Sequence, residues 1–142
     1  MSVDPTPPAP DAQDPVVDPF ADPFALADRL FAAVERGDTD ELRRIYHPEA
    51  RIWHNFDQRE QSVDENLQTL GWMCQRLFDR AYEVVRRERL DDGFLQQHVL
   101  RGITRSGAPF AMPACMVVRC EAGRITRIEE YLDPAQAVAL AG

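Results

Sequence analysis

The chain has 142 residues, which is enough for one domain. It carries 24 acidic against 16 basic residues and a net charge of −8, so it repels phosphate backbones, and nucleic acid is not expected as a partner. No apolar run approaches the roughly 20 residues that a transmembrane helix needs, so no membrane partner is expected either.

Residues 1–23 are predicted to form a disordered, extended tail. They include seven of the eleven prolines and five aspartates, with almost no large apolar residue before Val16. Such a segment cannot bury enough surface to offset its ordering entropy. It also lacks the basic start and apolar core of a signal peptide. Together with an odd number of cysteines that lack zinc-site spacing, this predicts a cytoplasmic protein with reduced thiols and no metal.

Two helices are predicted after the tail. The first, residues 24–36, has an apolar stripe at helical spacing, a capping aspartate at Asp22 and a terminating glycine at Gly37. The second, residues 39–46, starts from the capping-box pattern that begins at Asp38. Both are expected to bury one face against a core.

A strand and a third helix come next. Pro48 is expected to stop the second helix, and the strand then covers residues 51–56. Ser62 and Glu65 have the spacing of a capping box, and apolar residues repeat at helical spacing from there to Leu77. This pattern predicts a helix that faces the same core.

Four strands are predicted in the rest of the chain. The hydrophobic period changes toward two, and glycine-containing turns separate the segments 81–90, 94–104, 110–120 and 124–132. Pro113 suggests a bulge or an edge position in the third of them. The order predicts an α+β fold with a cone-shaped, curved antiparallel sheet and three N-terminal helices on its concave side. This domain covers residues 24–135, and residues 136–142 form a C-terminal tail.

The first strand carries the densest group of functional side chains. Side chains alternate between the two faces of a strand. One face therefore presents Trp53, Asn55 and Asp57, and the other presents Ile52, His54 and Phe56. Apolar surface with a few hydrogen-bonding groups is typical of a small-molecule pocket, although a tryptophan and a histidine on a strand are equally compatible with a structural core.

Three motifs, together with the order of elements, resemble the nuclear transport factor 2-like superfamily. They are Arg-Gly-Asp-Thr-Asp-Glu-Leu at 36–42, Tyr-His-Pro-Glu-Ala at 46–50 and Gly-Arg-Ile-Thr-Arg-Ile-Glu-Glu-Tyr-Leu-Asp at 123–133. The chain is most similar to the branch of SnoaL-like polyketide cyclases and ketosteroid isomerase-like proteins. The resemblance covers residues 24–135 and implies the fold more specifically than the reaction, because this fold hosts many chemistries.

The ketosteroid isomerase-like pattern implies His54 as a base. That pattern has an aspartate four residues after the alanine that corresponds to Ala50, and His54 stands there. An imidazole can accept a proton near neutral pH. The isomerase's tyrosine on the first helix corresponds to Leu30, so that proton donor is missing.

The epoxide hydrolase pattern of the same fold implies a different pair. Trp53 and Asn55 occupy its Tyr-x-Asn positions, and Glu130 matches its last acid. Its Arg-x-Asp falls on Gln97 and Val99, and no acid lies between Phe94 and Val118. Asn55 and Glu130 could therefore hold a water without any histidine.

These matches leave three choices between neighbours, namely His54 or Asn55, Gln97 or His98, and Glu129 or Glu130, because adjacent side chains on a regular strand face opposite ways. The candidate catalytic residues are His54, Asn55 and Glu130. The candidate substrate-binding residues are Trp53, Asp57, Trp72, Gln97 and His98.

Two functions remain open from the sequence. The first is an enzyme without a cofactor, of cyclase, isomerase or dehydratase type, that performs acid–base chemistry on an apolar carbonyl compound in the cone. The second is a non-catalytic module that uses the cavity for a ligand or acts as an accessory subunit. A homodimer is expected in either case, because the helices cover only one face of the sheet.

Overall fold

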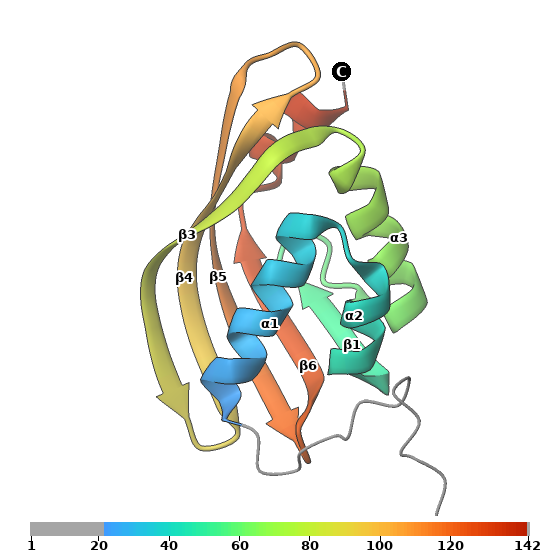
Figure 1. The fold of residues 1–142 in the computed structure, drawn as a ribbon, viewed down its shortest axis with the longest axis vertical. Helices are drawn as coiled ribbons and strands as arrows, with labels where there is room; N and C mark the ends of the chain where they lie inside the picture. Colours follow the sequence, from blue (N-terminus) through green and yellow to red (C-terminus); the bar gives the residue numbers. More distant parts are fainter. Residues whose placement is uncertain (1–21, 142) are drawn as a thin grey trace, which may run out of the picture.

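The computed structural model of the chain describes residues 22–141. The predicted disordered tail, residues 1–23, lies outside this range except for its last two residues. Figure 1 shows a strongly curved sheet with helices packed on its concave face. The elements in chain order are α1 (Pro23–Arg36), α2 (Thr39–Ile45), β1 (Tyr46–His54), β2 (Glu60–Gln61), α3 (Val63–Cys74), β3 (Leu77–Leu90), β4 (Gly93–Thr104), β5 (Pro109–Glu121), β6 (Arg124–Leu132) and a 3₁₀ helix, η1 (Pro134–Leu140).

The six strands form one sheet in the order β2-β1-β6-β5-β4-β3. The last four strands of the chain are successive antiparallel neighbours, and β1 joins this meander by pairing with β6. The predicted α+β class and curved sheet are confirmed. The pairing of β1 with β6 is parallel, however, so the sheet is mostly rather than wholly antiparallel.

The helix ends lie close to where the capping residues predict them. Asp22 accepts a hydrogen bond from the backbone N–H of Phe24 at 2.8 Å, and Gly37 ends α1 with a φ of +70°, a conformation that favours glycine. Ser62 and Glu65 form a reciprocal capping box at the start of α3. These local interactions orient both helices across the sheet.

The first strand differs most from its prediction. β1 begins at Tyr46 rather than at residue 51, so Pro48 lies inside the strand. The register with β6 shifts between Tyr46 and Arg51, and this irregular stretch tolerates a residue that has no N–H. In β5, Pro113 lies just beyond Ala114, the last β5 residue that pairs with β6, so it occupies a local edge.

The C-terminal segment is more ordered than a tail. η1 was not predicted, and it includes most of the residues assigned to the tail at 136–142. Asp133 caps it by accepting from the N–H of Ala135 at 2.9 Å, and Leu140 is buried. The short strand β2 was not predicted either. η1 packs against β5 and helps to close one end of the cone (Figure 1).

The core lies between the concave face of the sheet and the three helices. Apolar side chains of α1 pack on alternate residues of β4, and Phe31 contacts Phe94 with ring centroids 6.4 Å apart. Burial of such aromatic and aliphatic side chains is the main source of folding free energy. In the described part of the chain, no helix is long and apolar enough to cross a membrane.

Candidate functional site

The strand registers decide which side chains share the concave face. His54 of β1 is paired with Glu130 of β6, Glu130 with Met116 of β5, Met116 with Gln96 of β4, and Gln96 with Arg87 of β3. We call these five residues the concave row. Neighbouring strands lie about 4.8 Å apart, so His54 and Glu130 stand side by side.

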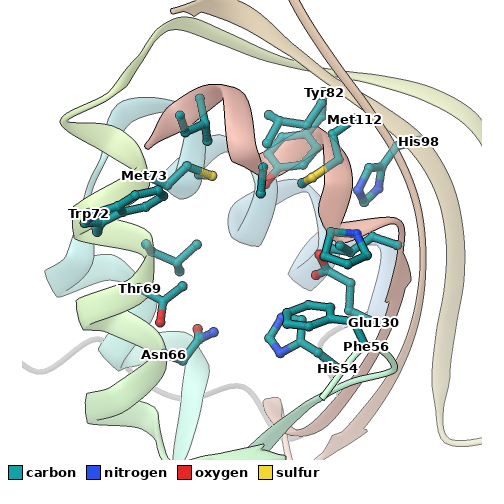
Figure 2. A pocket seen from close by; sticks show the side chains of 16 residues that line it. His54, Phe56, Asn66, Thr69, Trp72, Met73, Tyr82, His98, Met112 and Glu130 are labelled. Carbon is teal, nitrogen blue, oxygen red and sulfur yellow. The ribbon is translucent and has the colours of Figure 1, made fainter. Parts of the chain in front are cut away.

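A cavity of about 240 Å³ lies between the sheet, α3 and η1. Most of its wall is apolar, and its polar groups are few, as is usual for a small-molecule site. In Figure 2, His54, Phe56, His98 and Glu130 face Asn66, Thr69, Trp72 and Met73 of α3 across this space. The remaining lining residues are Leu70, Tyr82, Leu100, Met112, Leu132, Pro134, Ala137 and Leu140.

Four of the residues selected from the sequence line the cavity, namely His54, Trp72, His98 and Glu130. The alternation of the strands thus turns His54 and His98 inward in preference to their neighbours. Glu129 faces the other side of the sheet, where its carboxylate lies 3.9 Å from Nε of Arg127.

Trp53, Asn55, Asp57 and Gln97 do not line the cavity, which corrects their expected positions. Trp53 packs on Tyr131 of the outer face, with ring centroids 5.3 Å apart, and Gln97 is exposed on the same face. The strand β1 has ended at Asn55, whose side-chain oxygen accepts from the N–H of Leu132 at 2.9 Å. Asp57 instead caps the following turn by accepting from the N–H of Arg59 at 3.0 Å.

Glu130 is the acid of the cavity. Burial raises the pKa of its carboxyl from 4.5 to about 7. No hydrogen bond or ion pair joins its carboxylate to another side chain among the described residues. Its negative charge, added to burial, raises the pKa of Tyr46 and Tyr82. Glu130 also borders a smaller pocket of about 40 Å³ beneath α1, which has room for ordered water.

Both imidazoles of the cavity are neutral near pH 7. Burial lowers the pKa of His98 to about 4, and its ring packs edge-on against Tyr82 and Phe31 at centroid distances of 4.9 and 5.3 Å. Burial also lowers the pKa of His54, while the charge of Asp57 opposes this effect. A neutral imidazole offers one N–H donor and one nitrogen acceptor.

No three His, Cys, Asp or Glu side chains come together as metal ligands within residues 22–141. The cavity brings one carboxyl group and two neutral imidazoles together in a mostly apolar lining. A carboxyl with a pKa near neutral can both accept and donate a proton at physiological pH.

The family profile of the SnoaL-like domain matches residues 27–128 of the chain. The chain belongs to the SnoaL-like family. No curated protein matches its sequence.

Solved structures agree with this assignment at the level of the fold. IdmH, a proposed polyketide cyclase from Streptomyces antibioticus, is 20% identical, with a TM-score of 0.75 over 86% of this chain and 99% of that one. AclR, a proposed hydroxylase from Streptomyces galilaeus, is 14% identical, with a TM-score of 0.73 over 84% and 95%. A protein with a ketosteroid isomerase-like fold from Catenulispora acidiphila is 14% identical, with a TM-score of 0.69 over 82% and 92%.

Sequence reasoning missed several polar residues of this SnoaL-like site. Asn66 of α3 is buried, accepts from the Tyr46 hydroxyl at 3.3 Å and donates to Gln61 at 3.1 Å. Gln96 of β4 is fully buried beside His98. In both cases a polar residue interrupts the apolar stripe of its element, and that interruption is the signal that could have revealed it.

Proposed function

We propose that this SnoaL-like protein is an enzyme that moves a proton at the carbon next to a carbonyl group of a small, neutral, mostly apolar compound. The observation that carries this proposal is the carboxyl of Glu130, which burial in an apolar cavity holds at a pKa of about 7. A base with a pKa near the working pH is the most effective in proton transfer. Isomerisation, ring closure by carbon–carbon bond formation and dehydration all begin with such a step.

The other polar groups suit the charge that develops in this reaction. When Glu130 takes an α-proton, negative charge moves to the carbonyl oxygen, and an N–H donor near that oxygen lowers the barrier. His98 is neutral and lines the same cavity, so its ring can donate there. His54 stands beside Glu130 in the concave row and is the alternative base, as the sequence favoured.

The lining also restricts the substrate class. Among residues 22–141 no arginine lines the cavity, and both histidines in it are neutral near pH 7, so phosphate or carboxylate groups would find no cationic partner there. A dry cavity of about 150 Å³ accommodates benzene. The cavity of about 240 Å³ here suits a neutral compound with one or two fused rings enclosed, and a larger substrate would extend through the opening.

Hydrogen–deuterium exchange at the α-carbon of 2-tetralone, a neutral bicyclic ketone, tests the proposal without the natural substrate. The protein is incubated with the ketone in heavy water, and exchange is followed by proton NMR. We expect the wild type to accelerate exchange over buffer, and Glu130→Gln to lose about 10²–10⁴-fold, the usual contribution of a positioned acid–base group. Glu129→Gln, one residue away on the outer face, is the matched control and should keep the wild-type rate.

The variants also separate the two candidate bases. If His54→Ala abolishes exchange while Glu130→Gln retains it, then His54 is the base and Glu130 is not. If no variant differs from the wild type and none exceeds buffer, proton abstraction is refuted. Binding of 2-naphthol, read from Trp72 fluorescence in a Trp53→Phe background, would then identify a non-catalytic ligand-binding module.

We also propose that the protein is a homodimer that pairs through the outer face of its sheet. The helices cover only the concave face (Figure 1), and the outer face carries the exposed ring of Tyr131, which packs edge-on against Trp53. Such uncovered apolar surface is commonly an interface. Light scattering at tens of micromolar should give twice the chain mass, and Tyr131→Arg should lower it; a monomeric wild type would contradict the proposal.

A further inference from the structure

We propose that Gln96, oriented by Arg87, fixes His98 as the tautomer that carries its proton on Nε2, so that His98 presents a permanent N–H donor to the cavity. Gln96 and Arg87 would then be positioning residues that act through His98. The use of this donor in a reaction rests on the proposed function, whereas the tautomer itself does not.

The proposal begins from a chain of contacts that runs from the surface of α1 to the cavity. Nη1 of Arg87 donates to Oδ1 of Asp28 at 2.7 Å, and Nε of Arg87 donates to Oε1 of Gln96 at 2.8 Å. Nε2 of Gln96 lies 2.9 Å from Nδ1 of His98. These are ordinary hydrogen-bond distances.

The chemistry of arginine sets the direction of every bond in this chain. A guanidinium has donors and no acceptor, so the atom of Gln96 that meets Arg87 must be the amide oxygen. The amide nitrogen then faces His98, and because it can only donate, Nδ1 of His98 must accept. The proton of the neutral imidazole therefore sits on Nε2.

The free Nε2–H of His98 opens on the cavity. It has no hydrogen-bond partner among the described residues. Every fully buried side-chain nitrogen or oxygen of these residues does have a partner, so Nε2 is not fully buried. His98 as a whole is 3% exposed and lines the cavity, so the exposed surface of Nε2 contacts the cavity space. The donor is thus held in a fixed orientation toward the cavity, which is what recognition of a ligand oxygen would require.

The surroundings of His98 keep it neutral. Phe31 of α1 and Tyr82 of β3 pack against its ring, and burial raises the pKa of the Tyr82 hydroxyl, so neither brings a charge. Glu130 of β6 shares the cavity, and Arg87 brings a positive charge through Gln96. Protonation of Nδ1 would also place an N–H against the amide N–H₂ of Gln96, which is repulsive.

A purely structural role for this chain is the weaker explanation. Gln96 is fully buried on the inner face of β4, between Phe94 on one side and His98 and Leu100 on the other. An apolar side chain would fill that position without requiring Arg87 and His98 as partners. Buried hydrogen-bond networks of this kind fix one arrangement of their side chains.

Long-range ¹H–¹⁵N correlation NMR of the histidine side chains tests the inference directly. The chain has three histidines, so the spectrum is simple, and a His98→Gln variant assigns the His98 signals. In the wild type we expect the pattern of an Nε2–H imidazole at neutral pH. Gln96→Glu places a carboxylate acceptor at Nδ1, so the proton should move to Nδ1 or the ring should become imidazolium.

The pH titration of the same signals gives a second readout. An opposite charge at hydrogen-bond distance should raise the pKa of His98 by about one to three pH units in Gln96→Glu. Gln97→Glu is the matched control, because it adds the same charge one residue away on the outer face. Arg87→Met should leave the amide of Gln96 free to turn and make the Nδ1–H form detectable.

Two results would overturn the inference: an Nδ1–H imidazole at His98 in the wild type, or an Nε2–H signal unchanged in both Gln96→Glu and Arg87→Met. If the wild type exchanges the α-protons of 2-tetralone and Gln96→Glu moves the proton to Nδ1, the rate in this variant should fall at least tenfold with KM within a few fold, as expected when a transition-state donor is lost. An imidazolium would keep its Nε2–H, so the NMR spectrum decides which rate is expected. If no exchange occurs in any variant while the tautomer depends on Gln96, the inference stands and the proposed reaction fails.

Discussion

Replacing Glu130 by Gln should stabilise the fold at alkaline pH and leave it unchanged in acid. Burial raises the pKa of Glu130 from 4.5 to about 7, which means that the folded protein disfavours the carboxylate. Between these two pH values the folded state holds a proton that the unfolded state has released. The free energy of unfolding therefore falls as the pH rises through this window, and the loss is complete above about pH 7.

The size of the effect follows from the same two values. A difference of about 2.5 pH units (7 minus 4.5) at 1.36 kcal/mol per unit corresponds to about 3 kcal/mol of destabilisation by the ionised group. Water that enters the cavity solvates the carboxylate and reduces this figure, so about 2–3 kcal/mol is expected. A neutral amide of the same shape removes the effect, and Glu130→Gln should gain that amount at about pH 8 and almost nothing at about pH 4.5.

Urea unfolding of the wild type and Glu130→Gln across this pH range measures the difference. Glu129→Gln is the control, because this neighbour faces the outer side of the sheet near Arg127 and should show no comparable pH dependence. A stability difference between wild type and Glu130→Gln that does not change with pH would refute the reasoning. The same variant should lose the proposed proton exchange on 2-tetralone, so stability and that activity should move in opposite directions.

Three further predictions concern the scaffold and the cavity wall. Gly93→Ala should destabilise the protein by about 1–3 kcal/mol in thermal unfolding, because the new Cβ would lie 1.9 Å from the carbonyl oxygen of Val118. The control is Gly71→Ala in α3, whose new Cβ meets nothing within 4 Å, and it should be neutral or stabilising. Ser62→Ala removes the N-cap of α3 and should cost about 1 kcal/mol in the same assay. Trp72→Ala should weaken 2-naphthol binding at least tenfold in calorimetry with little change in melting temperature, because Trp72 lines the cavity and is 39% exposed.

Local sequence signals were sufficient for most of the fold. Asp22, Gly37 and the Ser62–Glu65 capping box act within a few residues of their own position, so the ends of α1 and the start of α3 could be predicted closely. The parallel pairing of β1 with β6 joins segments more than 70 residues apart, and nothing local encodes it. η1 escaped prediction because its only buried residue is Leu140, too little for a periodic pattern.

The candidate site could be predicted only as a set of alternatives. The sequence placed polar groups on the right strands, but the choice between His54 and Asn55 depends on where β1 ends, and the choice between Gln97 and His98 depends on register. The first is settled by the pairing of β1 with β6 far along the chain, and the second by the pairing of β4 with its neighbour β5. Gln96 was missed because a glutamine on a strand suggests an exposed residue, and its burial becomes reasonable only once Arg87 is seen beside it.

The concave row separates two kinds of polar group by a single apolar side chain. On one side of Met116, Gln96 and Arg87 satisfy each other and His98 through short hydrogen bonds. On the other side, His54 and Glu130 face the cavity without a bond between them. The first half has one low-energy arrangement and is suited to hold a donor still, whereas the second half has no fixed proton and is suited to exchange one. A rigid donor and a labile base that face one cavity from the same sheet are what the proposed proton abstraction next to a carbonyl group requires.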